Sequence, residues 1–275
     1  MVKRVLAVCL WALGVAVLAA PASAEDVKPI KALLITGGNA HDYKGQAKLL
    51  TEGLSARANI EWTIEHPVNA KGGEMPGNTM IDIYKKPDWI KGYDVVVHNE
   101  CYAEVKDKDF VESIARAHSE SGVPGVVIHG TLHAYRDLDK LTDAWRLFLG
   151  VTSDHHEAGG KTLEVKTVKA DHPIMIGLPE TWNTPNEELY VIGKEWPQCV
   201  PLAKCKSADD ATKDYTTIWV NTCGKAKVFG TSIGHANTTY QIPTYMDVMA
   251  RGLLWACDKL DDKGQPKPGY GPKAK

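Results

Sequence analysis

Short apolar runs alternate with longer segments of helical periodicity, and this order constrains the fold more than any other feature. The runs at 31–36, 93–98 and 125–129 each stop at glycine or polar residues, which is typical of buried strands. Apolar residues then recur at helical spacing over 45–58, 107–121, 138–149 and 244–260. Strands that alternate with helices predict an α/β fold with a mainly parallel open sheet and helices on both faces.

The second half of the chain is more extended. Strand patterns occupy 162–168, 189–192, 216–220 and 227–233, and a turn-like segment joins the last two. In the first half, 59–66 also alternates as a strand does. We therefore expect one domain over residues 29–260, with an antiparallel addition to its parallel sheet.

Both ends of the chain differ from this domain. Residues 1–24 have a positive start, an apolar run and a small-residue cleavage pattern, which predicts a signal peptide and a periplasmic or secreted protein. An uncleaved N-terminal anchor is the alternative, but we expect no stable membrane insertion after cleavage. Residues 261–275 are rich in Lys and Pro and are expected to form a disordered tail.

Charge and cysteine content narrow the functional classes. The formal net charge is −2 with both signs mixed along the chain, so we expect no nucleic-acid partner. Five of the six cysteines follow residue 24, and export would permit disulfides. Cys199 and Cys205 flank a short segment and are the favoured local bridge.

Histidines follow the ends of four predicted strands. They are His41, His98, His129 and His235, and His133, His155 and His156 lie nearby in the sequence. Since ligands in open parallel sheets bind beyond the carboxyl ends of the strands, we expect these side chains to converge there. A single loop histidine is more often a surface residue than a catalyst, but the set as a whole predicts a functional site.

Several segments resemble the trehalose-utilisation (ThuA-like) family in their order and spacing. They are GGNAHD at 37–42, GVVIHG at 125–130, WRLFLG at 145–150 followed by His155 and His156, HP at 172–173, IGL at 176–178, NEELY at 186–190, GKAKVF at 224–229 and TSIGH at 231–235. The resemblance covers residues 30 to 260. It implies a class I glutamine-amidotransferase-like fold, which is related to flavodoxin-like sheets, and a role in carbohydrate metabolism.

Two departures from the family pattern bear on the site. The family's Gly-Lys-Gly-Arg is replaced by Gly224-Lys-Ala-Lys227, which lacks a glycine and a guanidinium group. The segment from His129 to His133 lacks the acidic residue that relatives more often carry near its end.

Amidotransferases of this fold place a cysteine nucleophile at that turn, whereas here Cys101 lies one strand earlier. We expect Cys101 to be a buried structural thiol and glutaminase activity to be absent.

The resemblance implies a small-molecule carbohydrate as the partner, either a disaccharide or its 3-keto derivative. A keto group acidifies the neighbouring hydrogen, so a base could remove that proton and expel the leaving group. The candidate catalytic residues are His41, His129, His133, His156, Glu188 and His235. The candidate substrate-binding residues are Asn39, Asp42, Glu100, Trp182, Tyr190 and Tyr240. Among these, Asp42 and Glu100 could orient an imidazole, and the aromatic residues could stack on sugar rings.

Two interpretations of the histidines remain open. They could bind a divalent transition metal such as zinc, with His129, His133, His156 and His235 as candidate ligands, although no local ligand spacing supports this. Alternatively, they act as general acids and bases beside Glu188. The sequence therefore favours a hydrolase or lyase, and the competing hypothesis is a non-catalytic sugar-binding or accessory protein that could also bind a metal.

Overall fold

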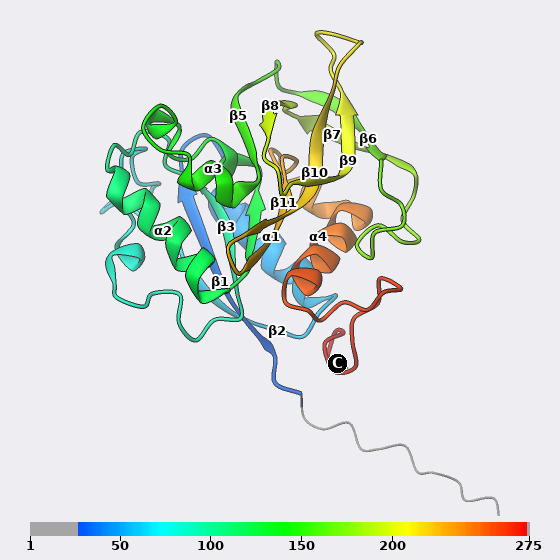
Figure 1. Cartoon of the computed structure of the whole chain (residues 1–275), viewed down its shortest axis with the longest axis horizontal. Coiled ribbons are helices and arrows are strands. Elements are labelled where there is room, and N and C mark those ends of the chain that lie inside the picture. The colour runs from blue at the N-terminus through cyan, green and yellow to red at the C-terminus, as the bar shows by residue number, and fades with distance from the viewer. Residues whose placement is uncertain (1–26, 274–275) are drawn as a thin grey trace, which may run out of the picture.

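The computed structural model describes residues 27–273, and the predicted signal peptide lies outside this range. Four α-helices cover the two faces of a central sheet, as Figure 1 shows. Helices α1 (Tyr43–Ser55) and α4 (Pro243–Ala256) bury their apolar residues against one face. Helices α2 (Lys108–Ser121) and α3 (Ala144–Leu149) pack on the other face. The helices are therefore distributed as the sequence predicts.

The sheet has the strand order β2-β1-β3-β4-β11-β10-β9-β6-β7. Its parallel part consists of β1 (Ile30–Gly38), β2 (Ile60–Glu65), β3 (Val95–Cys101), β4 (Gly125–Ile128) and β11 (Ala226–Thr231). Its antiparallel part consists of β10 (Asp214–Cys223), β9 (Val200–Lys206), β6 (Lys161–Thr167) and β7 (Thr181–Glu187). A separate pair joins β5 (Val151–His156) to β8 (Tyr190–Glu195). The α/β fold with an antiparallel addition is confirmed.

Burial along the strands explains this division. All seven residues of β3 are buried, because helices cover both faces of the parallel part. Along β6, by contrast, Leu163 and Val165 are buried while Thr162, Glu164 and Lys166 are exposed. A strand that is covered on one face alternates in this way, and a strand that is covered on both faces is buried along its whole length.

Several predicted elements differ from the structure. The predicted helix over 138–149 begins only at Ala144, and Leu141, which was expected on its buried face, is 66% exposed. The sequence patterns also did not predict the strands β5, β7 and β9. Strand β7 contains Pro185 and lies at the edge of the sheet, where a missing backbone N–H breaks no ladder bond. Polar residues and proline therefore weakened the strand pattern in the sequence, although pairing with neighbouring strands stabilises these segments.

The expectation of a disordered tail is wrong for residues 261–273. The backbone N–H of Asn59 donates to the carbonyl of Tyr270, and its side-chain amide donates to the carbonyl of Gly269. The backbone N–H of Lys267 also donates to Lys259, so the segment folds back on itself. A composition rich in Lys and Pro did not prevent order, because the backbone groups of this segment pair with the body of the domain.

The expected bridge between Cys199 and Cys205 is also wrong. All five cysteines of the described range are free thiols. Residues 200–206 form the extended strand β9, so Cys199 and Cys205 are separated by most of its length. At about 3.3 Å per residue, six residues span roughly 20 Å, far beyond the Cα separation of a disulfide.

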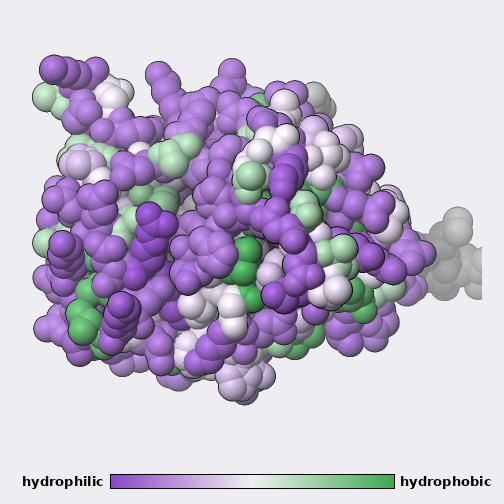
Figure 2. Space-filling view, turned by 90° about the horizontal axis from the view of Figure 1, so that it is seen from above, coloured by the Kyte–Doolittle hydropathy of each residue, from purple (hydrophilic) through white to green (hydrophobic). Residues whose placement is uncertain are grey.

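The surface of the domain is mainly polar. The face in Figure 2 is mostly hydrophilic, and its hydrophobic residues occur in small scattered groups. Among the described helices, none combines the length and the hydropathy that a membrane-spanning segment needs.

Candidate functional site

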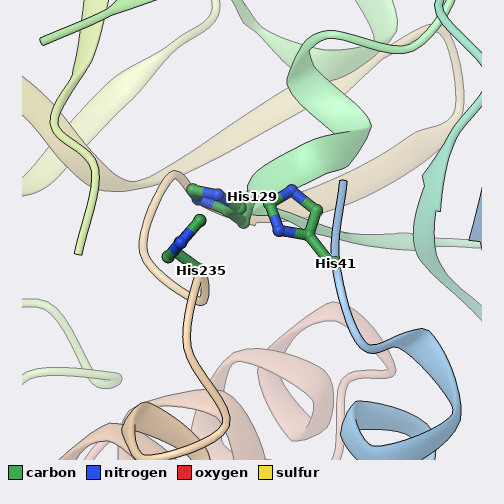
Figure 3. Close-up of side chains that lie close together, drawn as sticks. All are labelled: His41, His129 and His235. Atoms are coloured by element: carbon green, nitrogen blue, oxygen red, sulfur yellow. The ribbon is translucent and has the colours of Figure 1, made fainter. Parts of the chain in front are cut away.

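Three histidines from distant parts of the chain meet at the carboxyl ends of the parallel strands. His41 follows β1, His129 follows β4 and His235 follows β11. The ring centroid of His41 lies 4.8 Å from that of His129 and 5.1 Å from that of His235. Figure 3 shows the three rings gathered at one point, and one nitrogen from each lies within 4.8 Å of the others. The convergence that the strand ends predict is therefore present for these three.

Unusual backbone conformations place these rings. Ala40, His129 and Gly234 all have positive φ, at 81°, 37° and 134°. Such conformations are costly for residues with a Cβ and concentrate at functional sites. Gly130 also matters, because a Cβ at that position would lie 3.2 Å from the ring of His41. The turn after β4 therefore brings His129 and His41 into contact.

His129 is held in a defined orientation. Its side chain is buried, and its Nδ1 lies 2.7 Å from the carbonyl oxygen of Ser232. Because a carbonyl only accepts, Nδ1 must carry the proton in this hydrogen bond. In the neutral ring, Nε2 then carries the lone pair, and it lies 3.5 Å from Glu188 Oε2.

Glu188 lies among the histidines. Its Oε2 is 3.2 Å from His235 Nδ1 and 3.5 Å from His129 Nε2, and its Oε1 is 3.7 Å from His156 Nε2. Burial raises the pKa of Glu188, but His129 and His235 outweigh burial and hold the pKa below its usual range. Glu188 in turn raises the pKa of His235. The carboxylate is therefore ionised and its 15% exposed side chain is accessible at the rim.

His41 has the opposite electrostatic character. Burial, followed by the charges of His129 and His235, lowers the pKa of His41 to about 3. The ring is therefore neutral near physiological pH, which suits a lone-pair donor better than a proton donor.

A second group of rings flanks these residues. Tyr190 stacks on His133 with a centroid distance of 4.0 Å and an interplanar angle of 7°. The same tyrosine ring lies 4.5 Å from His129 and 5.7 Å from His156. The Nε2 of His133 lies 3.2 Å from Ser153 Oγ, and the Nδ1 of His156 donates to the carbonyl of Glu157.

The structure therefore divides the four candidate metal ligands of the sequence analysis. His129 and His235 lie together with His41, but His133 and His156 stack on Tyr190, and His156 is also near Glu188. His133 and His156 are therefore not part of the group whose nitrogens lie close together. The reason is that His156 lies on β5 and His133 follows the 3₁₀ turn 129–132, whereas the other three come directly after the carboxyl ends of β1, β4 and β11 in the parallel part of the sheet.

Glu187 is a positioning residue that the sequence analysis missed. Its buried carboxylate accepts from the backbone N–H groups of Gly234 and His235 and from the hydroxyl of Thr239. It therefore fixes the loop that carries His235. The signal was present, since side chains of consecutive residues in an extended chain point to opposite sides, so two adjacent glutamates cannot share one role.

Several expected site residues have other roles. Trp182, Tyr190 and Tyr240 are all buried, at 8%, 2% and 3% exposure, which contradicts the expectation that they stack on sugar rings. Asp42 caps α1 by accepting from the N–H of Gly45 and also accepts from Asn237, so it orients no imidazole. Asn39 is exposed beside the site, and its carbonyl accepts from the hydroxyl of Tyr43.

The fourth strand-end histidine, His98, does not reach the site. It is fully buried, with Nδ1 2.9 Å from Glu100 Oε1 and Nε2 3.1 Å from His118 Nε2. Glu100 thus orients an imidazole, but one in the core. His98 and Glu100 lie within β3, and their side chains point to the face that α2 covers. Cys101 is also buried, and burial raises the pKa of its thiol to about 11, which disfavours a thiolate nucleophile.

Solved structures with the same fold come from proteins of low sequence identity. Putative ThuA-like proteins from Parabacteroides merdae and Bacteroides uniformis match with TM-scores of 0.63 and 0.62 and identities of 19% and 16%. Each alignment covers 90% of this chain, with 98% and 99% of the respective relatives. A β-galactosidase from Bacillus circulans sp. alkalophilus matches with a TM-score of 0.53 and 14% identity, over 88% of this chain and 32% of that one. At these identities the likeness shows the fold alone.

No curated protein matches the chain. The sequence model of one family, ThuA, described as trehalose utilisation, matches residues 31–256. This range contains the converging histidines, both adjacent glutamates and every strand of the parallel sheet apart from the first residue of β1. The chain therefore belongs to the ThuA family.

Proposed function

We propose that this chain is an exported enzyme of carbohydrate metabolism, a hydrolase or lyase that acts on disaccharides or their 3-keto derivatives. Family membership supports the carbohydrate class. The observation that carries the proposal is the ionised carboxylate of Glu188 at a rim that it shares with His129, His156 and His235. A carboxylate between imidazoles provides a base and an acid within reach of one substrate.

The proposed reaction is an elimination. Glu188 removes the proton from the carbon that lies between the keto carbon and the glycosidic carbon. The electron pair forms a carbon–carbon double bond, the glycosidic C–O bond breaks, and the departing oxygen takes a proton. His156 is placed to supply that proton, since its Nε2 lies 3.7 Å from Glu188 Oε1 and its side chain is 38% exposed. Addition of water to the double bond would complete a net hydrolysis.

This chemistry needs one base and one acid, and does not need the paired carboxylates of ordinary glycosidases. Glu187 does not provide a second carboxylate, because its oxygens are committed to the loop that carries His235. Tyr190 supports the arrangement by packing against both His133 and His129.

The test is turnover by the purified mature protein. A 3-keto-disaccharide and its parent disaccharide are supplied separately, and release of the free sugar is measured. We expect Glu188→Gln and His156→Asn to lower kcat at least a hundredfold. His155→Asn is the matched control, because this neighbouring histidine is exposed and pairs only with Asp154.

Saturable sugar binding without turnover, unchanged in Glu188→Gln, would instead support the sugar-binding alternative. Absence of both binding and turnover with either sugar would refute the carbohydrate proposal. Export is tested separately, by detecting the protein in the periplasmic or extracellular fraction with its N-terminus near Glu25.

A further inference from the structure

We propose that His41, His129 and His235 bind one divalent transition-metal ion, such as Zn²⁺, and that Glu188 lies beside its open coordination position. The chemical role of the ion rests on the proposed function, but the site itself is argued from geometry alone. The ring arrangement of Figure 3 is the starting point.

Unpartnered nitrogens are the main evidence. His41 Nδ1, His129 Nε2 and His235 Nδ1 are all buried atoms without a hydrogen-bond partner in the described structure. Glu188 Oε2 is near two of them but is not aligned to accept a hydrogen bond from either. An unpaired buried polar atom is energetically unfavourable and rare in folded proteins, so three at one point need an explanation. A shared metal ion would satisfy all three.

The flanking histidines behave differently, which makes the assignment specific. The Nε2 of His133 is paired with Ser153 Oγ, and the Nδ1 of His156 with the carbonyl of Glu157. Neither ring contributes a nitrogen to the buried unpartnered set. Among the histidines of the described residues, the buried unpartnered nitrogens are therefore confined to the three rings that face one another.

The surroundings of His129 fit a ligand. A metal-binding histidine usually donates its other ring N–H to a carbonyl or carboxylate, which fixes the ring and directs the lone pair. His129 Nδ1 makes this contact with the carbonyl of Ser232 at 2.7 Å. The lone pair of Nε2 is thereby directed at the common point.

The spacing allows a metal after a small adjustment. With metal–nitrogen bonds of about 2.0–2.1 Å, ligand atoms of a tetrahedral site lie roughly 3.3–3.4 Å apart. One nitrogen from each ring lies within 4.8 Å of the others, so binding would draw the rings together by about an ångström. His41 and His235 are only partly buried and lie in loops, so their side chains have room to make this shift.

The fourth position determines what the ion could do. Glu188 Oε2 is 3.2 Å from His235 Nδ1 and 3.5 Å from His129 Nε2, but Glu188 is not part of the group whose ligand atoms all lie close together, so we assign it a place beside the fourth position. A water there would donate a hydrogen bond to Glu188, and a sugar oxygen could replace it. Three protein ligands and one open position are typical of catalytic zinc, whereas structural sites have four protein ligands. The ion would polarise the substrate oxygen beside the base.

The test measures metal binding directly. The mature protein is stripped with a chelator, reconstituted separately with Zn²⁺, Co²⁺, Ni²⁺ and Mn²⁺, desalted, and its metal content and Tm are recorded. We expect about one ion per chain, a rise in Tm with the bound ion, and at least tenfold weaker binding in His41→Asn, His129→Asn and His235→Asn. Binding should survive in His155→Asn, His156→Asn and Glu188→Gln.

The outcomes separate this inference from the proposed function. No binding of any of the four ions, or equal loss in His156→Asn, would overturn the three-histidine site, and equal loss in Glu188→Gln would overturn the open position beside Glu188. A variant that fails to fold is identified by its circular dichroism spectrum. The absorption spectrum of bound Co²⁺ in the remaining variants then shows whether the three histidines are its ligands. Sugar turnover that persists after metal removal would refute the metal's role while leaving the proposed function intact. Bound metal without sugar turnover would refute the proposed function while leaving the metal site intact.

Discussion

Removal of the buried carboxylate of Glu187 should destabilise the domain and release the loop that carries His235. In Glu187→Ala, the N–H groups of Gly234 and His235 and the hydroxyl of Thr239 lose their acceptor. A hydrogen bond to a charged group contributes about 1.5–3 kcal/mol, so three of them give at least ~4.5 kcal/mol. Relief from burying the carboxylate offsets part of this loss, and we expect a net decrease of about 3 kcal/mol in the free energy of unfolding.

The assay is urea unfolding followed by tryptophan fluorescence, with Glu164→Ala as the control. Glu164 is an exposed residue on the neighbouring strand β6, so its replacement should leave the midpoint unchanged. Glu187→Gln should be intermediate, because the hydroxyls of Thr184 and Thr239 can turn to accept from the new amide. A loss below about 0.5 kcal/mol in Glu187→Ala would refute the argument, since it would mean that these contacts contribute nothing net.

Three further predictions concern other parts of the chain. Burial, together with the charge of His98, lowers the pKa of His118. As the pH falls, the unfolded chain therefore binds a proton before the folded chain does, and stability should fall below about pH 6.5. Urea midpoints at several pH values should show this slope, and His118→Gln should flatten it. Gly130→Ala should displace the ring of His41 and weaken metal binding at least tenfold, as measured by metal content. Truncation after residue 260 should cost about 2 kcal/mol, measured by urea unfolding, because the backbone and side-chain amides of Asn59 lose their acceptors.

Each of these predictions has a contradicting result. An unchanged pH slope in His118→Gln would show that other groups dominate the acid response. Full metal content in Gly130→Ala would mean that the turn tolerates a Cβ at that position. An unchanged midpoint in the truncated chain would restore the interpretation of residues 261–273 as a dispensable tail.

Part of the site was predictable from the sequence. Buried runs that end in glycine and histidine placed His41, His129 and His235 at one edge of a parallel sheet, because the carboxyl ends of parallel strands share that edge. The same rule failed for His98, which lies before the end of β3. There the alternation of side chains directed the ring into the helix-covered core, where Glu100 pairs with it.

The choice among histidines needed the tertiary structure. Sequence patterns could not separate His133 and His156 from the three converging rings, since all five lie close to strand ends. The division depends on a register shift between β5 and β8, on the packing of Tyr190 and on positive φ at His129. None of these leaves a local sequence signal.

By itself, the sequence determined the α/β class, the helices on both faces, the antiparallel second half and the family, because hydrophobic periodicity and motif order are local properties of the chain. Only the tertiary structure decided which nitrogens are left unpaired, that Glu188 faces the rim while Glu187 faces the core, and that the tail packs against Asn59. These outcomes depend on contacts between residues that are far apart in the chain. Such contacts follow from how whole elements pack, and no short segment encodes them.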